Sequence, residues 1–206
     1  MPVNEIIQFR KHANEDRNLE MEVVIHCAPL IKGIKLANLM TISDREQERI
    51  PFLLEGTGIS YFFFPISKSK RFLYLYRAKW VCGYLNSMQI SDFLKEHGYQ
   101  IPSLMAGGDP EEQMKSYLRI LSQRVIMYHN RGKDSFPHEI GVFLGYPLSD
   151  VKGFLEDDGD GCICTGYWKV YGFEESKKNL FRRYNETREI AVREILDGRT
   201  LKEIAV

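Results

Sequence analysis

The stretch Ile59–Arg77, ISYFFFPISKSKRFLYLYR, carries the clearest β-strand signal in the chain. Two aromatic-rich runs, ISYFFFPI and RFLYLYR, flank the polar tetrapeptide SKSK, which is the pattern of a β-hairpin with a short loop. In the second run, aromatic residues alternate with Leu73 and Leu75, so both faces of this strand are apolar. Strands of this kind are buried on both faces. We therefore expect RFLYLYR inside a sheet that has protein packed against each face.

Helices are expected on both sides of this hairpin in the sequence. Ser43, with Glu46 three residues later, forms a capping box, and Asp109 followed by Pro110 is typical of a helix start. Pro29 and Gly33 are expected to interrupt the chain after an early helix. The sequence predicts helices over 4–12, 18–27, 43–56, 78–87, 91–98, 105–132 (closed by Gly132), 173–198 and 199–206, and further strands over 37–42 and 162–172.

The predicted elements indicate an α+β fold, with a small, mainly antiparallel sheet of about four strands packed with many helices. A length of 206 residues suits one domain, so residues 1–206 are interpreted as a single domain in which 110–160 could form a helical sub-region. The linker-like stretch 101–110 is too short to separate two independent domains.

Composition and charge exclude several classes of protein. Apolar residues make up 44% of the chain and charged residues 27%, which are ordinary globular values. Lysine plus arginine equals aspartate plus glutamate at 28 each, so no general attraction to nucleic acid or anionic membranes is expected. The first 18 residues lack the apolar region of a leader, and no apolar run approaches the roughly 20 residues of a membrane helix.

Cysteine usage points to a reducing compartment. Four cysteines in a chain of this length do not resemble a disulfide framework, so we expect free thiols and a cytoplasmic protein. Cys162 and Cys164 form a Cys-x-Cys pair, whereas zinc sites usually combine Cys-x-x-Cys with a second pair elsewhere. No metal site is therefore predicted. Phosphate-loop, dinucleotide, zincin and serine-hydrolase motifs are also missing from the sequence.

The segment 135–155, SFPHEIGVFLGYPLSDVKGFL, has the spacing of a helix-turn-helix. Gly141, Gly145, Val151 and Phe154 fit the small and apolar positions that let two helices cross closely, which predicts a helix pair near 138–156. The second helix offers no Arg, Asn or Gln to base edges, and the acidic run EDDGDG that follows would repel phosphates. A DNA-binding regulator stays open as an alternative, but we expect the pair to serve close packing.

The same segment carries a family resemblance. Pro137-His138-Glu139 and the motif Leu-Gly-Tyr-Pro at 144–147 resemble a bacterial family of unknown function that is marked by these two motifs. The stretches CAPLIKGIKLANL (27–39) and GYWKVY (166–171) extend the resemblance over most of the chain. It implies no activity, cofactor or catalytic residue. It does argue against an ordinary transcription factor.

Three cations raise the question of a ligand. Lys35, Arg77 and Lys169 lie within or just after apolar, strand-like segments, where a cation must extend to solvent, pair with a carboxylate or bind an anion. With Tyr146 and Trp168 nearby, they could hold an aromatic anion such as a nucleotide or a flavin phosphate. The alternative is a set of separate ion pairs.

The leading hypothesis is a protein that binds a small anionic ligand or cofactor, with or without catalysis, in a pocket at FPHEIGVFLGYP. The cofactor itself is not predicted, and neither is the oligomeric state. The residues expected to line the pocket are Lys35, Arg77, His138, Glu139, Tyr146, Trp168 and Lys169.

A second hypothesis is a thiol-dependent enzyme. Cys27 would be the nucleophile and His138 the base, since a reactive thiol needs a stabilised thiolate and a proton acceptor. Glu139, Asp150 or Asp160 could orient the histidine. The alternative is that Cys27 is a small buried apolar residue.

Overall fold

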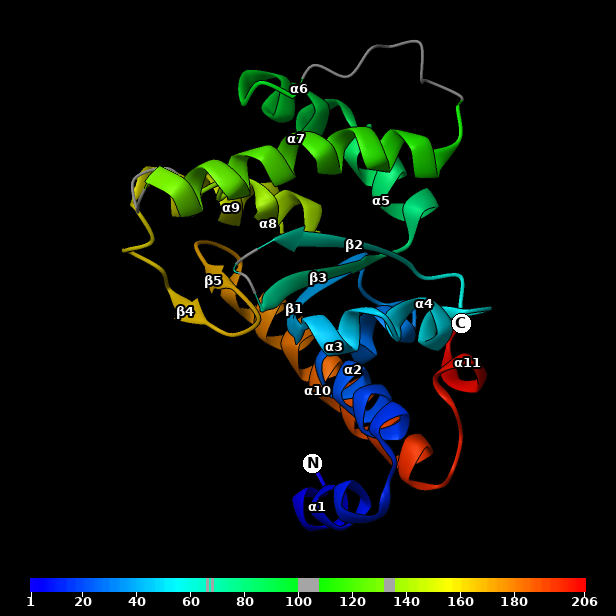
Figure 1. Cartoon of the computed structure of the whole chain (residues 1–206). Helices are drawn as coiled ribbons and strands as arrows, with labels where there is room; N and C mark the ends of the chain where they lie inside the picture. Colours follow the sequence, from blue (N-terminus) through cyan, green and yellow to red (C-terminus); the bar gives the residue numbers. More distant parts are fainter. Residues whose placement is uncertain (66, 68, 100–107, 132–135) are drawn as a thin grey trace.

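A three-stranded antiparallel sheet lies at the centre of the molecule (Figure 1). The computed structural model describes residues 1–65, 67, 69–99, 108–131 and 136–206. Its strands are β1 (Ala37–Ser43), β2 (Ser60–Pro65) and β3 (Lys70–Tyr76), in the order β1-β3-β2. A separate two-stranded hairpin is formed by β4 (Cys164–Thr165) and β5 (Lys169–Val170). The predicted α+β class with a small antiparallel sheet is confirmed.

The central strand β3 has a core on each face, as its sequence predicts. Leu73 and Leu75 are fully buried in one apolar cluster, and Tyr74 and Tyr76 are buried in the other. Alternate side chains of a strand point to opposite faces, so the two clusters lie on opposite sides of the sheet. The hairpin therefore positions two separate layers of helices.

The first layer packs on Leu73 and Leu75, and the second on Tyr74 and Tyr76 (Figure 1). The helices of the first layer are α1 (Val3–His12), α2 (Glu15–Ile31), α3 (Asp44–Gln47), α4 (Ile50–Leu54), α10 (Glu174–Leu196) and α11 (Leu201–Ile204). Those of the second are α5 (Ala78–Leu85), α6 (Met88–Glu96), α7 (Pro110–Arg131), α8 (Ile140–Phe143) and α9 (Leu148–Glu156).

Side-chain caps are present at two of the predicted helix starts. The Ser43–Glu46 capping box is present, and the Asp109 side chain accepts from the Glu111 N–H at 3.2 Å. The predicted helix 43–56 is nevertheless split into α3 and α4. Pro51 has no N–H to donate to the carbonyl four residues earlier, so the helix is interrupted before it. The predicted linker at 101–107 and the helix end at Gly132 lie outside the described residues.

Two predicted elements are wrong in extent. The helix 18–27 continues through Pro29 to Ile31, because a proline in the last turn removes only one hydrogen bond. The predicted strand 162–172 is a hairpin whose turn is closed by the Gly166 N–H, which donates to the Trp168 carbonyl at 3.0 Å. A Cβ on Gly166 would lie 2.3 Å from the Phe181 ring, so the turn sits directly against α10.

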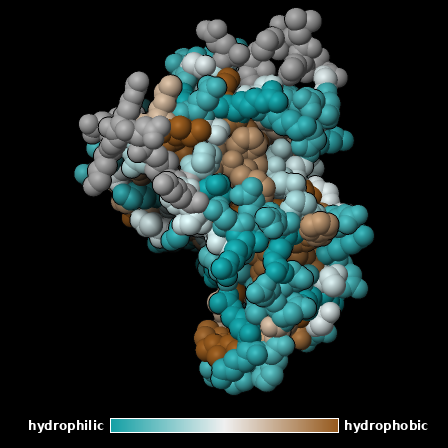
Figure 2. Space-filling model, viewed as in Figure 1, coloured by the Kyte–Doolittle hydropathy of each residue, from teal (hydrophilic) through white to brown (hydrophobic). Residues whose placement is uncertain are grey.

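The surface of the molecule is mostly hydrophilic in the view of Figure 2. The hydrophobic group at the lower end of this face lies at α1, where Met1, Val3 and Ile7 are exposed. Within the described residues, no helix combines the length and apolar composition needed to cross a membrane.

Candidate functional site

Helices α8 and α9 form the predicted close pair. Gly145 adopts φ +73° in the turn, a conformation that favours glycine. A Cβ on Gly141 would lie 3.0 Å from Val151 and 3.1 Å from the Tyr146 ring, so the small residue is what permits the close approach. The first helix is only one turn long, Ile140–Phe143. The pair near 138–156 is thus present, with a shorter first helix than a DNA-binding unit uses.

A cavity of about 210 Å³ lies where this helix pair meets the β4–β5 hairpin. Its wall is largely aromatic, and Tyr146 stacks on Trp168 with ring centroids 4.8 Å apart. Four of the residues predicted to line a pocket are on this wall, contributed by the FPHEIGVFLGYP segment and by the β4–β5 hairpin. The lining residues are His138, Ile140, Gly141, Tyr146, Asp150, Val151, Phe154, Tyr167, Trp168 and Lys169.

Asp150 is the buried carboxylate of the cavity, and its charge is matched by its neighbours. The Trp168 indole N–H donates to Oδ2 at 2.8 Å, and the Tyr171 backbone N–H donates to Oδ1 at 3.0 Å. Lys177 places its ammonium 3.6 Å from Oδ2. The sequence offered Asp150 only as a partner for other residues, because an acid in the first turn of a helix is common for its interaction with the helix dipole.

Lys169 brings an ammonium group to the cavity without a carboxylate partner among the described residues. Its Nζ donates to the Gly159 carbonyl at 2.5 Å and lies 5.7 Å from the centroid of the Phe154 ring. A carbonyl oxygen satisfies one of the three N–H donors and leaves the positive charge uncompensated.

Lys35 is a second cation beside the same wall. It is almost fully buried, donates to Asn38 Oδ1 at 2.6 Å, and lies 5.7 Å and 6.0 Å from the rings of Tyr146 and Tyr167. Burial lowers the pKa of Lys35 to about 8. It does not line the cavity itself, but it contacts two rings that do.

His138 presents an uncharged ring to the cavity near neutral pH. The imidazole lies 5.0 Å from the Phe136 ring and 4.7 Å from the Phe154 ring, and it makes no hydrogen bond within the described residues. Burial lowers the pKa of His138 below its ordinary value, and the charges of Glu139 and Asp158 offset this only in part. The nitrogens therefore remain available to a ligand.

Residues 23–205 match the family described as "Protein of unknown function (DUF3793)". The chain belongs to this family. The matched region contains every residue that lines the cavity, and the resemblance to a family of unknown function is confirmed. This DUF3793 member matches no curated protein and no solved structure. Its function must therefore be inferred from the chemistry of its own residues.

Two predicted lining residues of this DUF3793 member have partners elsewhere. Arg77 donates to the carbonyls of Leu30 and Ile31 at the end of α2, at 3.4 Å and 3.1 Å. Glu139 accepts from the Tyr99 hydroxyl and forms an ion pair with Arg124, both at 2.9 Å. Neither side chain lines the cavity.

Cys27 and His138 have no contact that would support a thiol enzyme. The thiol of Cys27 has no exposed surface, accepts from Asn38 Nδ2 at 3.3 Å and lies 3.8 Å from the Met40 sulfur. Burial raises the pKa of Cys27 to about 12, the opposite of what an activated thiolate needs. No hydrogen bond joins it to His138, and its contacts are with Asn38 and Met40.

The remaining cysteines do not form a metal site in the part of the DUF3793 chain that the structure describes. Cys162 lies 3.7 Å from the Thr165 hydroxyl, and all four cysteines are free thiols. No group of three or more His, Cys, Asp or Glu side chains is placed to hold a metal ion among the described residues.

Proposed function

We propose that the protein binds a small aromatic anion in the cavity between the α8–α9 pair and the β4–β5 hairpin. The observation that carries this proposal is the ammonium of Lys169, which lines an aromatic cavity without a carboxylate partner among the described residues. Asp150 is already matched by Lys177, so it does not occupy the ammonium of Lys169. An anion beside this ammonium would gain a charge-assisted hydrogen bond.

The shape of the cavity favours a ligand with one or two rings. A volume of about 210 Å³ equals the liquid volume of roughly seven waters, and it is smaller than the roughly 300–1,000 Å³ of pockets that enclose drug-sized ligands. A whole flavin or nucleotide would have to extend out of it. A ring packed against Tyr146 and Trp168 would gain offset stacking. Its acidic group would then reach Lys169.

We also propose that the protein works in the cytoplasm and does not read nucleic acid. Free thiols at all four cysteines support a reducing compartment. The α9 helix is followed by the exposed acids Asp157 and Asp158, which would repel a phosphate backbone.

The test is calorimetric titration with paired probes that differ only in charge. Salicylate and indole-3-carboxylate should bind, and their neutral amides should bind about tenfold more weakly, because the charge-assisted hydrogen bond is lost. The variant Lys169→Met should lose this preference for the acids. Lys152→Met, at an exposed position of the neighbouring helix, is the matched control and should behave as the wild type.

Equal affinity for acids and amides in the wild type would refute the anionic part of the proposal. Native mass spectrometry of the freshly purified chain complements the titration. A retained mass that disappears in Lys169→Met would identify the physiological ligand.

A further inference from the structure

β1 is an edge strand, and its backbone groups alternate between the sheet and the outside. The Arg77 N–H donates to the Leu36 carbonyl at 3.2 Å, one position beyond the β1–β3 register. Hydrogen-bonded pairs alternate along an antiparallel ladder, so residues 38, 40 and 42 bond to β3. The N–H and C=O groups of Leu39, Thr41 and Ser43 must then point away from the sheet.

Two further features, one on each edge of the sheet, agree with this alternation. The Ser43 N–H is bonded outside the sheet, to Glu46 Oε2 at 2.7 Å, in the capping box of α3. On the opposite edge, the same rule turns the nitrogen of Pro65 outward, the only arrangement in which a strand tolerates proline without losing a ladder bond. Pro65 therefore removes one outward donor from the edge of β2, whereas β1 contains no proline.

The open part of β1 is short and well defined. Glu46 closes it at Ser43, and Ala37 at the other end is fully buried. Among the described residues, nothing hydrogen-bonds to the outward groups of Leu39 and Thr41. Unpaired edge groups of this kind accept a further strand readily.

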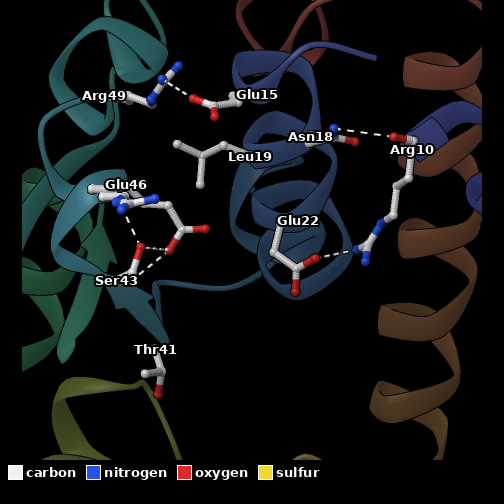
Figure 3. Close-up of a pocket in the computed structure, with 10 residues that line it drawn as sticks. Arg10, Glu15, Asn18, Leu19, Glu22, Thr41, Ser43, Glu46 and Arg49 are labelled. Atoms are coloured by element: carbon white, nitrogen blue, oxygen red, sulfur yellow. Dashed lines mark hydrogen bonds and ion pairs between the residues drawn. The ribbon is translucent and has the colours of Figure 1, made fainter. Parts of the chain in front are cut away.

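A polar groove of about 520 Å³ runs beside this open edge (Figure 3). Thr41, Ser43 and Glu46 lie on one side of it, and Leu19 and Glu22 of α2 lie on the other. The outward N–H and C=O groups of Leu39 and Thr41 offer main-chain hydrogen bonds to an extended chain lying in this groove.

Two of the three arginines that line the groove pair with carboxylates, and Glu46 accepts from the N–H and the hydroxyl of Ser43. Arg10 pairs with Glu22, and Arg49 pairs with Glu15. Arg45 has no hydrogen bond or ion pair from its side chain within the described residues, although it lines the same groove. A carboxylate is the natural complement of an unpaired guanidinium.

We propose that this groove receives an extended polypeptide segment of another protein, which adds a strand to β1 at Leu39–Thr41 and places a carboxylate against Arg45. The main-chain bonds would supply affinity, and Arg45 would select an acidic side chain or a chain end at one position. This site is separate from the cavity at α8–α9, so its test does not depend on the proposed function.

The experiment is selection of phage-displayed random peptides on the full-length protein, followed by fluorescence anisotropy with a selected peptide. Thr41→Pro removes the outward N–H and should weaken binding about tenfold or more. Thr41→Val keeps that N–H and should bind as the wild type. Arg45→Gln should weaken binding of peptides that carry an acidic residue, and should leave their Asp-to-Asn or Glu-to-Gln counterparts unaffected.

Proline is compatible with folding at position 41, because its nitrogen faces outward. If Thr41→Pro nevertheless fails to fold, hydrogen exchange of the wild type decides, since bound peptide should protect the amides of Leu39 and Thr41. Three results would overturn the proposal: no selected peptide, equal binding to Thr41→Pro and Thr41→Val, or protection confined to other residues.

Discussion

Lys35 combines deep burial with an uncompensated charge, and this has a consequence for stability against pH. Burial lowers its pKa in the folded chain from 10.5 to about 8, whereas the unfolded chain keeps the proton until about pH 10.5. Below pH 8 Lys35 is charged in both the folded and the unfolded chain, and the folded chain carries the full free-energy cost of burying that charge. Between pH 8 and 10.5 the folded state loses its proton first, so the stability of the folded state rises with pH.

The variant Lys35→Met keeps the apolar stem and removes this titration. Relative to Lys35→Met, the wild type should gain about 3 kcal/mol of stability between pH 8 and 10.5, because each pH unit in this range contributes about 1.36 kcal/mol. Urea unfolding at a series of pH values measures the difference. Lys79→Met, at an exposed position, is the control. Parallel pH profiles for the wild type and Lys35→Met would contradict the expectation.

The sequence alone predicted a cavity-lining residue only where other lining residues lay close to it in the chain. His138 and Tyr146 flank α8, and Trp168 and Lys169 are adjacent, so local motifs sufficed to group them. Arg77 was expected to seek an anion. Its guanidinium instead donates to carbonyls at the end of α2, some 46 residues away in the chain, and no local pattern reveals such a partner.

At the scale of elements, the α8–α9 crossing depends on a residue that sequence spacing already singled out. Gly141→Ala would press a methyl group against Val151 Cγ2 at 3.0 Å and should destabilise the protein by about 1–3 kcal/mol. A methyl group at Gly83 in α5 would meet no atom within 4 Å, so Gly83→Ala should instead stabilise by about 0.5–1 kcal/mol. The thermal and urea midpoints of the two variants should therefore shift in opposite directions from those of the wild type. Equal shifts would mean that the crossing is not tightly packed.

Elements marked by turn or capping residues in their own sequence could be predicted. Elements whose shape depends on contacts with distant segments could not. The hairpin 59–77 and the capping box at Ser43 are encoded by neighbouring residues. The turn of the β4–β5 hairpin depends on Phe181, which fills the space beside Gly166 from α10. The sequence CICTGYWKVYG by itself therefore predicts one strand, because the packing of α10 against its turn is not visible in these residues.

At the scale of the whole molecule, β3 joins the two cores through its alternating side chains. Leu73 and Leu75 belong to the layer of α2 and α10, while Tyr74 belongs to the opposite layer and donates its hydroxyl to the Phe143 carbonyl at 2.6 Å. Melting either layer would leave alternate side chains of the same strand without partners. The two cores should therefore unfold together, as the sequence-based interpretation of a single domain also expects.

Cooperative unfolding can be tested with the two tryptophans, which lie in different parts of the fold. Trp80 is on α5 and Trp168 is on the β4–β5 hairpin. In Trp80→Phe and Trp168→Phe, the remaining tryptophan should report the same urea midpoint as the far-ultraviolet circular dichroism of that variant. Leu73→Ala, placed in either background, should lower the stability reported by both signals together by about 2–5 kcal/mol, because β3 links the cores. Two separated transitions, with only one displaced by Leu73→Ala, would show instead that the layers are independent folding units joined by a shared sheet.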